Sequence, residues 1–213
     1  MIVSIANLPK RYRGALNLVV NDRDFDVVAR NTILLIILLT IDEPRTAAEY
    51  AVHIFYSAFI TRPCHDALRL KIKPLIQEVC DKIAGRSPDT LFRKTWTFGE
   101  CHFRLTLTKD KWLGLLSFFD VPEGLTKTVA QEVRERITCA TERVDYVDRH
   151  LVCQAAEHRI CIAKFRSDGL LLPFGNPRAE FEIPQSVSAK CCCRRNFVDE
   201  NTGLSFKKQM SGL

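Results

Sequence analysis

The chain has 213 residues, of which 46% are hydrophobic and 26% are charged, and its formal net charge is +6. Such values are typical of a globular protein and imply a sizeable buried core. The most hydrophobic run, Thr32 to Ile41, is far shorter than the roughly 20 residues that cross a bilayer, so we expect no membrane anchor.

The nine cysteines are odd in number and scattered, and no secretory segment follows Met1, which indicates a reducing, cytoplasmic location. They form no CxxC pair and the histidines form no HxxxH pair, so we expect no metal site. The role of the adjacent Cys191, Cys192 and Cys193 stays open. The basic excess lies partly near the C-terminus, and no arginine-rich run with interleaved aromatic residues accompanies it. We therefore do not expect a nucleic-acid partner.

In chain order, the first predicted element is a buried strand from Ala15 to Asn21, which follows Gly14 and contains two adjacent valines. Three carboxylates come next. Asp22 directly follows the strand, where an acidic residue of a doubly wound sheet can bind the ribose of a cofactor. Asp24 is expected to cap the following helix and Asp26 to lie in its first turn, so an ordinary strand-to-helix turn explains part of the same pattern.

Three helices are predicted next. The first runs from Phe25 to Thr40 and is apolar on nearly all sides. Pro44 interrupts the pattern, and Thr46 with Glu49 has the spacing of a capping box that opens a helix reaching about Phe59. The third helix contains Pro74, which should start a turn or kink it. Its apolar stripe consists of Leu68, Ile72, Ile76, Val79 and Ile83.

Aromatic and polar residues then alternate on both sides of Gly99 and Glu100. This alternation predicts that residues 92–98 and 101–107 pair as a hairpin through a type II′ turn. The side chains expected to be largely buried are Trp96, Phe98, Phe103 and Leu105.

Further helices are predicted over residues 111–119, around Leu125 to Ile137 with a capping box at Thr128, and over residues 155–166. A half-buried strand is predicted over residues 179–183. The hydrophobic rhythm stops after Pro184. We therefore divide the chain into one α/β domain, residues 1–184, and a loose polar C-terminal tail, residues 185–213.

No catalytic residue can be assigned from the sequence. The chain has no GxSxG motif, and the adjacent Cys101 and His102 should face opposite sides of a strand. These observations favour a protein without a nucleophilic site.

Five motifs occur along the chain: LNLVVNDRDFDVVARNTILLIILLTI, AVHIFYSAFI, KTWTFG, LLSFFDVPEGLT and GLLLPFGNPRAEF. In this order they resemble the fungal domain of unknown function 4470, which often occurs with MYND zinc fingers. That domain is related to the N-terminal domain of dynein axonemal assembly factors. The resemblance covers about Asn7 to Pro184. It implies a Rossmann-like, class I methyltransferase-like α/β sheet, here lacking the usual N-terminal strand and glycine turn, with an added β-hairpin and helices.

Two functions stay open. One is a non-catalytic protein-binding or assembly module on a degenerate methyltransferase-like fold, with a protein partner and no cofactor. The alternative is an S-adenosylmethionine-dependent methyltransferase, or the remnant of one, in which Asp22 holds the ribose. A cofactor site of this kind needs a glycine-rich turn between a strand and a helix, and no such turn precedes Ala15. The sequence therefore favours the binding module over an enzyme.

Overall fold

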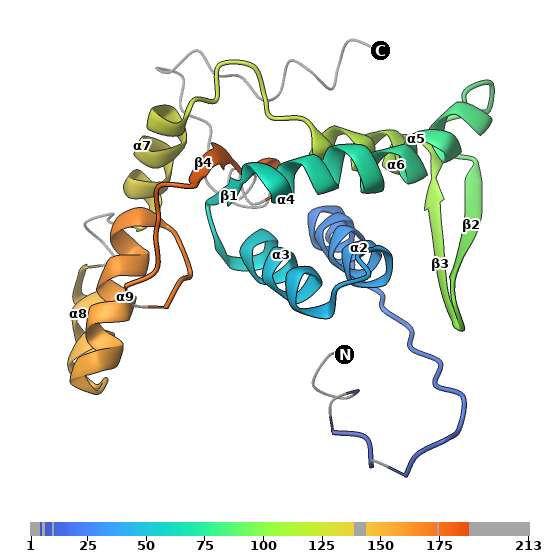
Figure 1. Cartoon of the computed structure of the whole chain (residues 1–213). Coiled ribbons are helices and arrows are strands. Elements are labelled where there is room, and N and C mark those ends of the chain that lie inside the picture. The colour runs from blue at the N-terminus through green and yellow to red at the C-terminus, as the bar shows by residue number, and fades with distance from the viewer. Residues whose placement is uncertain (1–4, 6, 10, 139–143, 174, 188–213) are drawn as a thin grey trace.

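The protein has a mixed α/β fold dominated by helices. The computed structural model (Figure 1) describes residues 5, 7–9, 11–138, 144–173 and 175–187. Among them, β1 (Phe59–Thr61) pairs antiparallel with β4 (Phe181–Pro184), and β2 (Leu91–Phe98) pairs antiparallel with β3 (Cys101–Thr108). These two small sheets are separate. The expected Rossmann-like, methyltransferase-like sheet is therefore not confirmed by the described residues.

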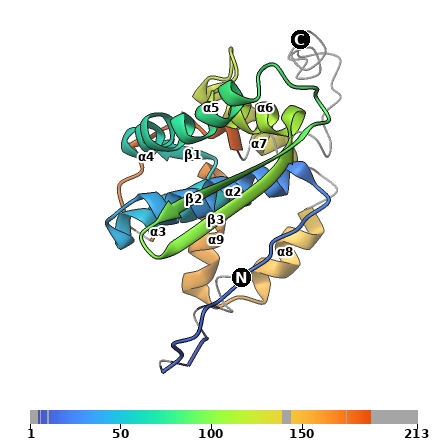
Figure 2. The same ribbon diagram turned by 90° about the vertical axis from the view of Figure 1, so that its right-hand side faces the viewer.

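Two helices, α2 (Phe25–Thr40) and α3 (Pro44–Tyr56), lie side by side beneath a layer of further helices (Figures 1 and 2). Asp24 caps α2 as predicted, because its Oδ1 accepts a hydrogen bond from the Asp26 N–H at 2.9 Å. The capping box predicted at Thr46 is wrong. Glu43 caps α3 instead and accepts from the backbone of Arg45 and Thr46, while Pro44 occupies the first turn, where its missing N–H costs little.

The upper layer begins with α4 (Arg62–Ala67), continues through a π-helical turn, η1 (Leu68–Ile72), and ends in α5 (Lys73–Lys82). All five residues of the predicted apolar stripe are buried. Pro74 lies in the first turn of α5, two residues after the π turn ends at Ile72. Proline donates no backbone hydrogen bond, and its ring crowds the turn before it. The kink or turn predicted at Pro74 therefore appears as the π-helical turn η1, which is wider than an α-helical turn.

The β2–β3 hairpin has the predicted register, with Phe98 opposite Cys101 across a two-residue turn. Gly99 has a φ of 59° and no non-glycine residue in the described chain has a positive φ, which fits the expected type II′ turn. Trp96 and Leu105 are buried as predicted. Phe98 and Phe103 are half-buried and pack against the edge of the core.

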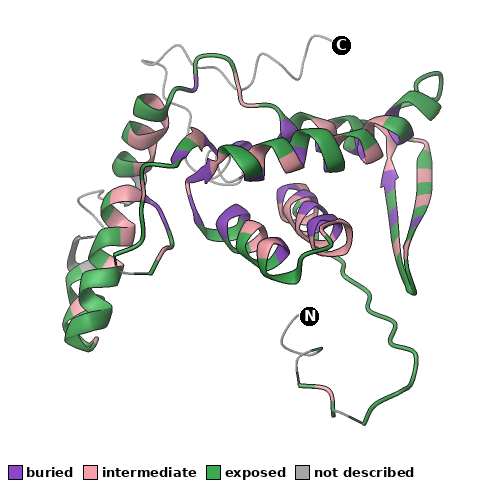
Figure 3. Ribbon diagram, in the orientation of Figure 1, coloured by how far each residue is buried: buried purple, intermediate pink, exposed green. Residues whose placement is uncertain are grey.

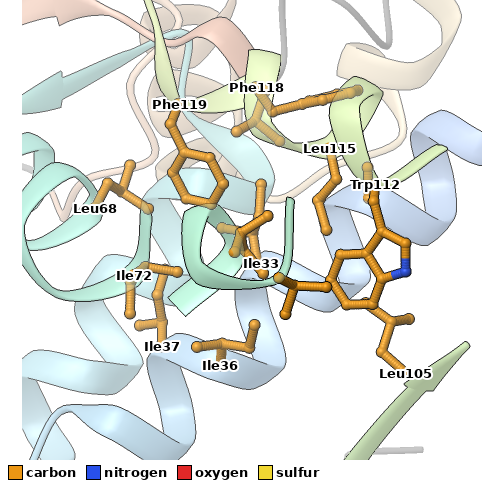
Figure 4. Close-up of a cluster of buried hydrophobic side chains, with 14 of the residues drawn as sticks. Ile33, Ile36, Ile37, Leu68, Ile72, Leu105, Trp112, Leu115, Phe118 and Phe119 are labelled. Carbon is orange, nitrogen blue, oxygen red and sulfur yellow. The ribbon is translucent and has the colours of Figure 1, made fainter. Parts of the chain in front are cut away.

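One hydrophobic core joins the two helical layers and the hairpin (Figure 4). The predicted helix after the hairpin is confirmed as α6 (Lys109–Leu116), followed by a 3-10 turn, η2 (Ser117–Phe119). The Trp112 side chain is fully buried, and its Nε1–H donates to the carbonyl of Phe92 at 3.3 Å. Side chains that meet around it in Figure 4 include Ile33, Ile36, Leu105 and Leu115.

The remaining helices are α7 (Lys127–Thr138), α8 (Val144–Val152) and α9 (Ala156–Asp168). The helices predicted around Leu125 to Ile137 and over residues 155–166 are confirmed by α7 and α9, whereas α8 was not predicted. Thr126, and not Thr128, lies before α7, where its Oγ1 accepts from the Val129 N–H at 3.3 Å. Gly169 ends α9 with a φ of 72°, and a Cβ there would lie 2.8 Å from Arg134 and 2.9 Å from Ala58.

The packed part of the chain extends past the expected boundary at Pro184. Gln185, Ser186 and Val187 are all buried. Gln185 donates from its side chain to the carbonyl of Ile54, and Ser186 donates to the carbonyl of Phe118. The prediction that residues 185–187 belong to the loose tail is therefore wrong, because they contribute to the fold. Residues 188–213, including the three adjacent cysteines, lie outside the described residues.

We predict that a chain ending at Pro184 melts well below the full chain. It loses the burial of Val187, worth about 1.5–3 kcal/mol, and two side-chain hydrogen bonds worth about 1 kcal/mol each. Thermal unfolding followed by circular dichroism measures the difference. A chain ending at Val187 is the matched control and should melt close to the full chain; equal melting of the two shortened chains would contradict the prediction.

Candidate protein-interaction segment

The N-terminal segment, residues 15–21, is exposed to solvent. It has no regular secondary structure and, in the described chain, no strand pairs with it, so the prediction of a buried strand here is wrong. Figures 1 and 2 show it leaving α2 and running away from the helical body, and it is coloured as exposed in Figure 3. Four apolar side chains are exposed by 44–93%: Leu16, Leu18, Val19 and Val20.

An acidic turn, residues 22–26, connects this segment to α2. The Oδ1 atom of Asp22 accepts from the Asp24 N–H at 2.9 Å, and the Oδ1 atom of Asp24 accepts from the Asp26 N–H at 2.9 Å. Two successive side-chain turns of this kind fix the direction in which the chain enters the helix. The carboxylates of Asp22 and Asp24 therefore organise the backbone locally.

The helix after this turn is firmly held by the core. Ile33, Ile36 and Ile37 on α2 are exposed by no more than 1%. Phe25, the first residue of the helix, packs edge-on against Phe118 with a centroid distance of 6.2 Å. The N-terminal segment is thus an exposed apolar stretch attached directly to one of the most buried helices of the described structure.

The described residues do not fit S-adenosylmethionine. A methyltransferase site needs a strand beside the ribose-binding acid to support the adenosine, and a glycine-rich turn through which the backbone approaches the methionine part. Asp22 is exposed at the end of an unpaired segment, and its carboxylate already accepts the N–H of Asp24. We therefore derive no chemistry through this cofactor.

A buried His–Ser pair at the end of α3 is a polar contact that the sequence patterns did not predict. The Nδ1 atom of His53 lies 3.0 Å from the Oγ atom of Ser57, and the Leu171 N–H donates to the same oxygen at 3.2 Å. Both side chains are at most 5% exposed. The signal available in the sequence is their spacing of four residues, about one helical turn, at the end of α3. Through these two contacts the Ser57 hydroxyl connects α3 to the chain after α9. Its oxygen is buried away from any substrate, so we do not assign it as a nucleophile.

Burial also makes two thiols unreactive. Desolvation, with a smaller contribution from Glu49, raises the pKa of the Cys64 thiol to about 12, and desolvation raises the pKa of Cys80 to about 11. Both therefore stay protonated at neutral pH. No group of three His, Cys, Asp or Glu side chains that could hold a metal ion occurs within the described ranges.

One open depression of about 470 Å³ lies beside the β1–β4 pair. It is lined by Thr61, Arg62, Pro63, Ala179, Glu180 and Glu182. Its polar side chains are a hydroxyl, a guanidinium and two carboxylates, with no thiol or imidazole among them. In the part of the chain that the structure describes, none of the helices is long and apolar enough to cross a membrane.

Comparison with known families finds a match for the N-terminal part of the chain. Residues 1–60 match the family described as "Domain of unknown function (DUF4470)". The DUF4470 match contains the N-terminal segment, the acidic turn, α2 and α3, and covers 60 of the 213 residues. The motifs of the resemblance after this region, as far as Pro184, lie outside it. No curated protein and no solved structure matches the chain.

We predict that the chain shows no saturable binding of S-adenosylmethionine or its demethylated product. Asp22 lacks the neighbouring backbone that would enclose these ligands. Isothermal titration calorimetry of the full chain and of Asp22→Ala tests this. Micromolar affinity that disappears in the Asp22→Ala variant would contradict the prediction and support the methyltransferase alternative.

We predict that stability falls on acidification because of His53. Burial lowers the pKa of this imidazole from its ordinary value of 6.5, and nearby Glu49 only partly opposes the shift. As the pH falls below 6.5, His53 of the unfolded chain binds a proton before His53 of the folded chain does. The contribution of the neutral imidazole to the free energy of unfolding is therefore complete above pH 6.5. It is lost progressively as the pH falls toward the lowered pKa of the folded chain. The loss is at most about 1.4 kcal/mol per pH unit.

Melting temperatures between pH 7.5 and pH 5 of the parent chain and of His53→Gln measure this effect. The variant should be less stable at pH 7.5 but should lose less stability on acidification. Parallel curves for the two chains would show that His53 does not contribute to the pH dependence.

Proposed function

We propose that this chain is a protein-binding or assembly module without catalysis of its own, and that the N-terminal segment is its contact surface. One observation carries the proposal: Leu16, Leu18, Val19 and Val20 form a run of exposed apolar side chains on an unpaired stretch of chain. Exposed apolar patches of this kind mark sites of protein association. Contact with a partner would remove this surface from water.

Addition of a strand to a partner is the mode of binding that suits the segment. Leu16, Leu18 and Val20 alternate with Asn17 and Val19, so a strand formed here has one wholly apolar face. The backbone groups of residues 16–20 have no hydrogen-bond partner among the described residues. They are available to pair with the edge of another strand, which would supply the main-chain hydrogen bonds while side-chain pockets supply specificity.

The family-level resemblance accords with this role. The proposed relation to dynein axonemal assembly factors and to MYND-containing proteins suggests an assembly function rather than a metabolic one. We place the module in the cytoplasm, where reducing conditions keep buried thiols such as Cys64 and Cys80 reduced.

The test is site-specific photo-crosslinking in cells. We predict that a benzophenone side chain at position 19 forms covalent adducts with a protein chain, since Val19 is 93% exposed at the centre of the segment. The same probe at Leu70, which is 75% exposed on the π turn, is the matched control and should react much less. Equal yields at the two positions, or no adduct at position 19, would contradict the proposed function.

A further inference from the structure

We infer that the outer edge of β2 binds an acidic, extended segment of another protein, which adds to the β2–β3 hairpin as an antiparallel third strand. This surface is separate from the N-terminal segment, so the inference goes beyond the proposed function. Three observations carry it: the open backbone edge of β2, two arginine side chains beside that edge and the aromatic residues on the opposite face of the strand.

The outer edge of β2 is open in the described chain. Phe98 and Cys101 close the two-residue turn, and from such a turn onward every second antiparallel pair exchanges backbone hydrogen bonds. The N–H and C=O groups of Arg93, Thr95 and Thr97 therefore point away from β3. Figure 1 shows this edge on the outside of the molecule, whereas β3 lies against α2 and α6. An added strand would form main-chain hydrogen bonds with all three residues.

The polar face of the hairpin, which the structure describes in full, is basic and carries no acidic side chain. Its members are Leu91, Arg93, Thr95, Thr97, His102, Arg104, Thr106 and Thr108. Arg93 and Arg104 are exposed, and neither takes part in an ion pair with the described residues. Guanidinium groups bind carboxylates through charge-assisted hydrogen bonds, so this face favours an acidic ligand.

A hydrogen bond across the hairpin directs Arg104 toward the open edge. Its Nε–H donates to the Oγ1 atom of Thr95 at 3.3 Å, so the guanidinium group lies beside β2 although Arg104 belongs to β3. An acidic residue opposite Thr95 in the added strand would reach this group. A second acidic residue, opposite Arg93, would lie on the same face. The ligand therefore has two acidic residues separated by one other residue.

The opposite face of β2 provides an apolar contact. Phe92 and Phe98 are half-buried there, and Lys94 between them already pairs with Glu78 at 3.5 Å. Apolar side chains that alternate with the acidic ones would cover the exposed parts of the two rings. Charges on an edge strand oppose unspecific pairing. Arg93 repels a basic strand and has no partner in an apolar one, so an acidic strand is the occupant that this edge selects.

The first experiment measures binding of a labelled synthetic peptide, in which glutamate and valine alternate, to the full chain by fluorescence anisotropy in reducing buffer. We expect saturable binding that weakens with added salt. Arg93→Glu and Arg104→Glu should each weaken it at least about tenfold. Arg69→Glu makes the same charge change on η1 and should leave the affinity unchanged. All three arginines are exposed, so the variants should stay folded.

The second experiment separates strand addition from attraction between unlike charges. In the antiparallel arrangement the glutamate amides of the peptide face β2 and the valine amides face away. N-methylation of the glutamate amides should therefore abolish binding, whereas N-methylation of the valine amides should preserve it. A peptide that alternates lysine with valine should bind the parent chain poorly and the double variant Arg93→Glu, Arg104→Glu well, which also shows that this variant is folded.

Several outcomes would overturn the inference. They are no saturable binding of the glutamate peptide, equal binding of the lysine peptide by the parent chain, arginine variants that bind as well as the parent, and binding that survives methylation of the glutamate amides. Self-association that Arg93→Glu removes would assign the edge to a second copy and overturn it as well. Weak binding by Arg93→Glu and Arg104→Glu but not by Arg69→Glu, with recovery by the lysine peptide, would support the inference.

Discussion

Packing of the isoleucine face of α2 against the α4–η1–α5 layer holds the rest of the molecule in place. Ile33, Ile36 and Ile37 share the core with Leu68 and Ile72 of this layer and with Trp112 of α6 (Figure 4). Full burial of each isoleucine contributes about 1.5–3 kcal/mol, a large share of the net stability of a domain of this size. The hairpin closes one end of the contact through Trp96, whose ring lies 6.0 Å from that of Trp112. Elements that do not enter this core depend on other contacts.

Buried polar groups connect the end of α3 to the chain after α9 and to the residues that follow β4. Ser57 accepts from the Leu171 N–H, Gln185 donates to the carbonyl of Ile54, and Ala58 and Gly169 are joined by a backbone hydrogen bond of 2.8 Å. A small separate cluster of Phe59, Leu170 and Phe181 supports them. Because a buried polar group without its partner is costly, these contacts tolerate little change in geometry. They fix the end of α3, the β1–β4 pair and the chain after α9 relative to one another.

A buried core with an exposed apolar segment attached to it suits the proposed binding module. The acidic turn directs residues 15–21 out of α2, so the segment starts from a fixed point although it has no neighbour of its own. A partner strand then needs to order only a short stretch of chain, which limits the entropic cost of association. The same geometry explains why Asp22 is a weak candidate for cofactor binding: its carboxylate supports the turn and no described strand encloses a ligand beside it.

The sequence by itself determined the elements whose signals are local. The Asp24 cap, the apolar stripe from Leu68 to Ile83 and the Gly99 turn of the hairpin depend on residues a few positions apart, and the structure has all three. Only the tertiary structure decided whether residues 15–21 are buried, because an apolar strand pattern is the same whether or not another strand lies beside it. It also decided the burial of Gln185 to Val187 and the bond between Ser57 and Leu171, because their partners lie 68 to 131 residues away, beyond the range of any periodicity or capping signal.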